Sequence, residues 1–141
     1  MNDNLIIMGI NAPRQHQAVI TQLIYELAKL YKEGKTLFFP LPETMIDESQ
    51  TSPVPDVMVV EPTSGLVKMI IEVTHTQGVK KDLKKLKDLM ADYDVPEGFV
   101  YDYKRDTWYR CEAGRENVDE DSFSRAVKQD LRSMLDTKIE F

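Results

Sequence analysis

The sequence predicts a single α/β domain spanning residues 1–141, with a mixed central sheet flanked by helices. Apolar residues recur at helical spacing in three segments, and apolar runs bounded by Pro and Gly lie between them. A hydrophobic content of 42% with 30% charged residues is typical of a folded chain. The 141 residues suffice for one core and are too few for two domains.

Composition and charge narrow the class of protein. The one cysteine, Cys111, excludes an intramolecular disulfide and a cysteine-based zinc site, which favours a reducing compartment. Asp3 stands where a signal peptide has positive charge, and no run approaches the roughly 20 apolar residues of a membrane span. We therefore expect a cytoplasmic protein without membrane contact. The net charge of −6 argues against avid, nonspecific binding to nucleic acid.

The first half of the chain is predicted as one helix and three strands. Apolar residues recur every three or four positions over residues 13–31, which indicates a helix. Residues 37–46 are extended in character but hold two prolines, which places them at a sheet edge or bulge. A polar loop at residues 47–53 leads into strands at residues 55–61 and 66–74. The short turn between these two strands predicts a hairpin.

The second half is predicted as helix, two strands and helix, which completes the order α-β-β-β-α-β-β-α. Residues 78–94 have helical periodicity and end before Pro96. Strands at residues 99–102 and 107–111 form a second hairpin. The apolar residues of the predicted final helix are Phe123, Ala126, Val127, Leu131, Met134 and Leu135.

Two acids fall at one end of the first hairpin. Side chains alternate faces along a strand, so Glu72 and Thr74 share one face. Asp56 begins the partner strand, and antiparallel pairing makes it a neighbour of Glu72. Two adjacent carboxylates repel unless a cation or a proton intervenes, and Mg²⁺ suits such an oxygen-rich site. The alternative is that Asp56 caps a turn while Glu72 lies on an exposed face and pairs with a lysine.

Five short motifs resemble one known family of enzymes. The stretches NAPRQH, PDVMVV, IEVTHT, DLKKLKDLM and DVPEGFVYD follow one another over roughly residues 8 to 110. In this order they resemble the PD-(D/E)XK phosphodiesterase superfamily, and within it the Uma-type restriction-endonuclease-like family. The resemblance implies a restriction-endonuclease-like core and a nuclease that depends on Mg or Mn. It also implies that Asp56 and Glu72 bind the metal.

The sequence departs from this pattern where the superfamily has its lysine. That position, two residues after Glu72, is Thr74, whose hydroxyl can orient a water but cannot replace an ammonium. The family's relocated lysine would fall on Leu86. Lys85 is the best substitute, because helical geometry places it beside the apolar stripe on the edge shared with Asp82. The alternative for Lys85 is an ion pair with Asp82.

Three further residues are accessory candidates: His16, Glu26 and Asp82. The resemblance places His16 at the edge of the site, although a hydrogen-bonded structural histidine fits the same inward-facing position. The resemblance implies that Glu26 binds a second metal or a water. The alternative is that Glu26 lies on a solvated edge of its helix. Asp82 is a candidate because it is the first acid of the motif DLKKLKDLM.

These observations predict a metal-dependent nuclease with Asp56, Glu72, Thr74 and Lys85 as its catalytic residues. Nucleic acid is the expected partner, DNA before RNA, and the acidic charge suggests that binding requires a homodimer or a partner chain. The rival hypothesis is a catalytically degenerate module that keeps the fold and binds nucleic acid or a protein. A phosphodiesterase acting on another substrate is a third possibility.

Overall fold

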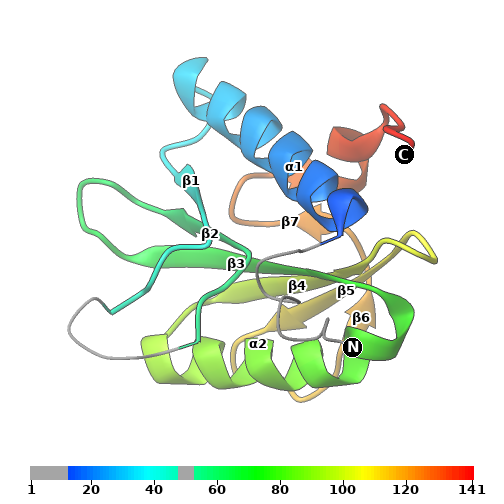
Figure 1. The fold of residues 1–141 in the computed structure, drawn as a ribbon. Coiled ribbons are helices and arrows are strands. Elements are labelled where there is room, and N and C mark those ends of the chain that lie inside the picture. Colours follow the sequence, from blue (N-terminus) through cyan, green and yellow to red (C-terminus); the bar gives the residue numbers. More distant parts are fainter. Residues whose placement is uncertain (1–12, 48–52) are drawn as a thin grey trace.

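A six-stranded mixed sheet separates two helical layers in this computed structural model, which describes residues 13–47 and 53–141 (Figure 1). Helix α1 (Arg14–Lys32) covers one face and α2 (Val79–Tyr93) the other. The strands lie in chain order across the sheet: β1 (Phe39–Pro42), β2 (Val57–Val60), β3 (Val67–Thr74), β4 (Glu97–Asp102), β5 (Thr107–Glu112) and β6 (Asp119–Glu120).

Strand β3 joins an antiparallel part of the sheet to its parallel part. It pairs antiparallel with β2, in a register that places Val57 opposite Ile71, and parallel with β4. The short 3-10 helix η2 (Thr76–Gly78) and α2 make the crossover between the two parallel strands. Both predicted hairpins, β2–β3 and β4–β5, are confirmed.

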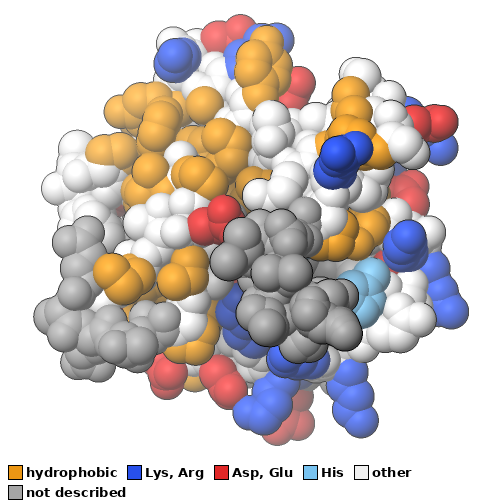
Figure 2. Space-filling model, viewed as in Figure 1, with side chains coloured by type: hydrophobic (Ala, Val, Ile, Leu, Met, Phe, Trp, Pro, Cys, Tyr) orange, Lys and Arg blue, Asp and Glu red, His pale blue; other side chains and the backbone are white. Residues whose placement is uncertain are grey.

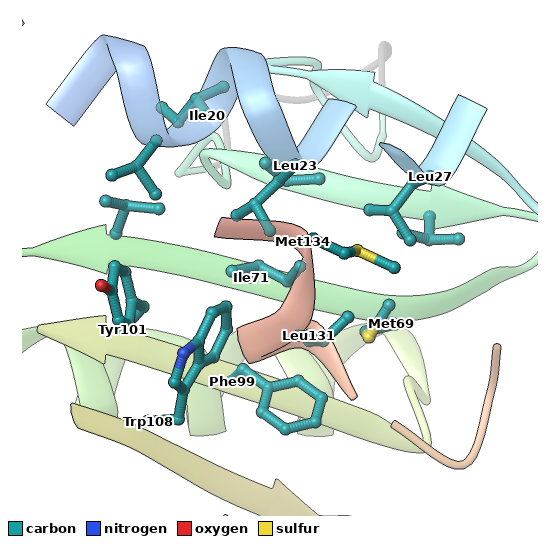
Figure 3. Close-up of a cluster of buried hydrophobic side chains, with 14 of the residues drawn as sticks. Ile20, Leu23, Leu27, Met69, Ile71, Phe99, Tyr101, Trp108, Leu131 and Met134 are labelled. Carbon is teal, nitrogen blue, oxygen red and sulfur yellow. The ribbon is translucent and has the colours of Figure 1, made fainter. Parts of the chain in front are cut away.

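The core is divided by the sheet into two parts. Figure 3 shows the part beneath α1, where Leu23 and Leu27 pack over Ile71, Phe99 and Trp108. The part beneath α2 takes the alternate strand residues, as the period of two requires. It contains Ile70, Val100, Leu86, Leu89 and Met90.

Local signals end both helices. Gly34 has φ 75 just after α1, a left-handed conformation that glycine adopts without a Cβ penalty. Asp94 has φ 58 as the C-cap of α2, and its N–H bonds to the carbonyl of Met90. Pro96 follows and excludes further helix.

The proline-containing segment forms the edge strand β1, as predicted. Among the strands that the structure describes, it pairs with β2 alone. Pro40 and Pro42 have no N–H to donate, so the segment suits a strand at an edge.

The prediction of an amphipathic helix at the end of the chain is wrong. The chain instead makes the short strands β7 (Phe123–Ser124) and β8 (Gln129–Asp130) and the 3-10 helix η3 (Leu131–Leu135). Buried Glu97 accepts hydrogen bonds from Ser124 Oγ and from the backbone N–H groups of Arg125 and Ala126, which holds the chain in a turn. Lys128 has φ 57, a value that no helix contains. Leu131 and Met134 still bury their side chains beneath α1.

Two predictions lie outside the described residues. They concern the N-terminal segment, with Asp3 and the first two residues of NAPRQH, and most of the polar loop at residues 47–53. Within the described ranges, no helix is both long and apolar enough to cross a membrane.

Candidate active site

The β2–β3 hairpin brings Asp56 beside Glu72. Because Val57 pairs with Ile71, the residue before Val57 stands opposite Glu72 at the end of the hairpin. Asp56 Oδ2 accepts a hydrogen bond of 2.8 Å from the backbone N–H of Val73. The predicted juxtaposition of the two acids is therefore present in the fold.

Glu72 is a buried carboxyl with one unpaired oxygen. Its exposed fraction is 1%, and no hydrogen-bond partner for Oε2 is found within residues 13–47 and 53–141. Burial raises the pKa of Glu72 to about 8, and the negative charge of Asp56 adds to this, while Lys85 acts in the opposite direction. Without a cation, this carboxyl keeps its proton at neutral pH.

Lys85 reaches Glu72 from α2. Its Nζ lies 3.1 Å from Glu72 Oε1 and 2.9 Å from the carbonyl oxygen of Val54. Among the described residues, the structure records no ion pair between Lys85 and Asp82. Lys85 thus pairs with Glu72, and its role as the site lysine stays a prediction.

His16 contacts Asp56 from the first turn of α1. His16 Nε2 lies 3.4 Å from Asp56 Oδ2, and His16 Nδ1 lies 2.7 Å from Gln17 Oε1. Burial acts to lower the pKa of His16, but the hydrogen bond and charge of Asp56 outweigh it and raise the pKa overall. Burial acts to raise the pKa of Asp56, but His16 and the Val73 N–H outweigh it and lower the pKa. Both effects favour a charged pair.

Thr74 turns its hydroxyl to α2, where it hydrogen-bonds with Asp82. Burial raises the pKa of Asp82, and the Thr74 hydrogen bond partly offsets this. Gly78 lies so close that a Cβ on it would overlap Thr74 Oγ1. The residue in the superfamily's lysine position is thus enclosed, with an exposed fraction of 6%.

Two positions stay apart from this cluster. Glu26 lies ten residues after His16 on the same helix, which is ~15 Å along the axis, so the structure does not bring it to the two acids. Leu86 has an exposed fraction of 0% and packs in the core beneath α2. The family's relocated lysine would therefore have to be buried here.

The two acids are ligands of the type that a hydrated divalent cation uses. No group of three or more His, Cys, Asp or Glu suited to hold a metal ion is found in residues 13–47 and 53–141. The set that is present consists of two carboxylates, Asp56 and Glu72, and the unpaired Oε2 of Glu72 leaves an acceptor free. Hard, hydrated cations such as Mg²⁺ are held by one or two carboxylates together with phosphate oxygens.

The surroundings of the acids are locally basic. Residues 75–87 contain five lysines and one aspartate. Figure 2 shows Lys and Arg side chains gathered at the lower right, over the N-terminal half of α2. Lys80 and Lys81 are exposed there. This segment of the chain is basic although the whole protein carries a net charge of −6.

Two partners of the site escaped prediction from the sequence. The carbonyl of Val54 holds Lys85, and the amide of Gln17 holds the ring of His16. A backbone carbonyl leaves no trace in residue identity. For Gln17, the only signal was its position next to His16.

Three comparisons relate the chain to known proteins. A family model described as "Uma2: Putative restriction endonuclease" matches residues 1–134. A crystal structure from Anabaena variabilis, described as "a putative nuclease belonging to DUF820", is 14% identical with a TM-score of 0.59. This match covers 85% of the present chain and 81% of the other, and it shows a shared fold. No curated protein matches.

Proposed function

The chain belongs to the Uma2 family of restriction-endonuclease-like proteins, and from that premise we propose that it hydrolyses phosphodiester bonds in nucleic acid with a divalent cation. The single observation that carries the proposal is the pairing of half-buried Asp56 with buried Glu72, whose Oε2 has no hydrogen-bond partner among the described residues. Desolvating two adjacent carboxyls is costly, and this cost supports a cation as the ligand of this end of the sheet.

Asp56 and Glu72 would hold Mg²⁺ or Mn²⁺. When bound, the cation polarises the phosphate and lowers the pKa of a water. Lys85 holds Glu72 in position through its 3.1 Å contact and balances part of the negative charge. His16 holds Asp56 from the other side. Thr74 stays accessory, since its hydroxyl is engaged by Asp82 and carries no charge.

The expected substrate is a nucleic-acid strand, with DNA as the first candidate. The lysines at the start of α2 attract phosphates to the end of the sheet where the acids lie. A homodimer would add a second basic face to an otherwise acidic chain, and we keep this as part of the proposal.

Hydrolysis of labelled oligonucleotides with Mn²⁺ or Mg²⁺ tests the proposal. Asp56→Asn and Glu72→Gln should each lower the rate at least a hundredfold, because each removes a cation ligand. Lys85→Met should lower it about tenfold or more. Asp88→Asn is the matched control, since Asp88 is an exposed acid of α2 about one turn beyond Lys85. Equal rates in the parent and both acid variants would reject the proposal.

One observation favours a second candidate, a module that binds nucleic acid without cleaving it. Both places where the superfamily would have lysine are buried, at Thr74 and Leu86. This candidate predicts DNA binding that neither Mn²⁺ nor Glu72→Gln alters, together with no hydrolysis under any condition. Cation-dependent cleavage by the parent excludes it.

A further inference from the structure

A cavity of about 330 Å³ lies on the α1 side of the sheet, away from the face that carries Glu72. Three parts of the chain line it: the N-terminal half of α1, the end of β4 with the turn after it, and residues 135–140. Figure 1 shows η3 beside α1 and the β4–β5 turn reaching to the same side. The lining side chains used below are Gln15, Gln22, Tyr101, Tyr103, Lys104 and Asp106.

The cavity adjoins the candidate active site. Gln15 in its wall precedes His16, which contacts Asp56. The backbone N–H of Tyr103 donates a 2.9 Å hydrogen bond to the carbonyl of Thr74. The cavity and the carboxyls thus lie at the same end of β3, on opposite faces of the sheet.

Two polar groups of the lining are already paired with each other. Tyr101 OH donates to Asp106 Oδ1 at 2.8 Å, and Arg132 Nη1 donates to Asp106 Oδ2 at 2.8 Å. The charge of Asp106 is therefore balanced, and neither Tyr101 nor Asp106 is the main group offered to a ligand.

Among the other groups of the lining, one tyrosine, one lysine and two glutamines suit a flat heterocycle with a nearby phosphate. Tyr103 is half-buried, and Lys104 Nζ lies 5.8 Å from the centre of its ring. The amide of Gln15 has no partner among the described residues, and Gln22 uses its Nε2 on the carbonyl of Ala18, which leaves its Oε1 as an acceptor. An aromatic ring together with amide donors and acceptors is the chemistry that binds nucleobases in single strands.

We propose that this cavity takes one unpaired base of a nucleic-acid strand whose backbone lies at the carboxyl site. The inference rests on the proposed function, which brings the strand to this end of the sheet. A volume of about 330 Å³ is near the lower limit of ligand pockets, so one nucleotide fits and a base pair does not. Lys104 stands at the mouth to meet the adjoining phosphate. The protein therefore prefers strands with an unpaired nucleotide beside the bound phosphate.

Fluorescence anisotropy with three labelled oligonucleotides tests the inference: a single strand, a fully paired duplex and a duplex with one bulged base. Ca²⁺ replaces Mg²⁺ and Mn²⁺, so that a cation is present at the carboxyls, and gel electrophoresis checks that the strands stay intact. Tyr103→Ala should weaken binding of the single strand and the bulged duplex about tenfold and leave the paired duplex unchanged. Tyr103→Phe should restore binding, because stacking requires the ring and not the hydroxyl. Tyr25→Ala, at an exposed tyrosine of α1, is the matched control and should change nothing.

The outcomes separate this inference from the proposed function. Equal effects of Tyr103→Ala on all three oligonucleotides, no effect on any, or a parent that binds none would overturn the inference. Base-dependent binding through Tyr103 without hydrolysis by the parent would support the cavity and reject catalysis. Hydrolysis that requires Glu72 but ignores Tyr103→Ala would do the reverse.

Discussion

Two buried glutamates have opposite surroundings in this protein. Glu97 accepts hydrogen bonds from Arg110, Ser124 Oγ and two backbone N–H groups. Glu72 is equally buried, but among the described residues only Lys85 bonds to its carboxyl, through one oxygen. A buried carboxyl with full partners stabilises the fold, whereas one with an unpaired oxygen costs free energy. The unpaired oxygen of Glu72 is therefore expected to lower the stability of the fold, whereas Glu97 is expected to raise it.

Stability should therefore fall with rising pH because of Glu72. Folding raises its pKa from 4.5 to about 8, so the folded state binds more protons than the unfolded state between these values. The free energy of unfolding of the cation-free protein then decreases by a few kcal/mol as pH rises through this window. Glu72→Gln should remove this decrease and be more stable than the parent at pH 8.5. Urea denaturation at pH 5, 7 and 8.5 measures it, and parallel profiles for parent and variant would contradict the account.

At the scale of residues, the sequence predicted the two candidate acids better than the groups that hold Lys85 and His16 beside them. Strand alternation and the hairpin were enough to pair Asp56 with Glu72. Rotation about the helix axis selected Lys85 over its neighbouring lysines, and its contact with Glu72 agrees with that choice. The Val54 carbonyl depends on loop geometry that no residue identity encodes. Glu26 sits on a plausible helix edge, but periodicity does not reveal how far along a helix the site lies.

The junction of β3 and α2 depends on one glycine. Gly78 has φ −91, so its backbone suits any residue, and only the Thr74 hydroxyl excludes a side chain there. Gly78→Ala should cost about 1–3 kcal/mol of unfolding free energy by overpacking. In a Thr74→Ala background the cost should vanish, because the added Cβ would then lie 3.5 Å from the Cβ of residue 74.

Denaturant unfolding of the parent, both single variants and the double variant measures this coupling as a double-mutant cycle. A coupling energy near zero would show that Thr74 does not confine Gly78.

The stability of the C-terminal segment should depend on Glu97. Glu97→Ala removes the acceptor that joins β4 to the turn after β7 and leaves Arg110 with Glu112 as its only anionic partner. Loss of one member of a buried pair costs about 3–5 kcal/mol. Thermal unfolding followed by circular dichroism measures the loss. Glu120→Ala, on an exposed strand, is the control, and a similar small change in both variants would contradict this role.

At the scale of elements, the spacing of apolar residues predicted those helices and strands whose form depends on residues close in the sequence. Both hairpins, the edge strand and the first two helices follow from local patterns of apolar residues, Pro and Gly. The final segment has helical spacing too, but Glu97, 27 positions before Ser124, takes its hydrogen bonds. A long-range acceptor of this kind overrides local propensity and cannot be read from spacing.

At the scale of the whole molecule, charge is distributed unevenly. The chain carries −6 in total, while residues 75–87 carry five lysines and one aspartate. One of these lysines, Lys85, contacts Glu72, and the segment as a whole is more basic than the rest of the chain. The nucleic-acid partner is thus compatible with an acidic protein, provided that it approaches this end of the sheet.

Calorimetric titration with Mn²⁺ tests the central claim, that Asp56 and Glu72 together hold a cation, most directly. At pH 7 Glu72, with a pKa of about 8, keeps its proton until the cation displaces it. Titrations in buffers of different ionisation enthalpy should therefore show one Mn²⁺ bound with about one proton released. Binding should be lost in Asp56→Asn and Glu72→Gln and kept in Asp88→Asn. Mn²⁺ binding that survives both acid variants, or no binding by the parent, would contradict the claim.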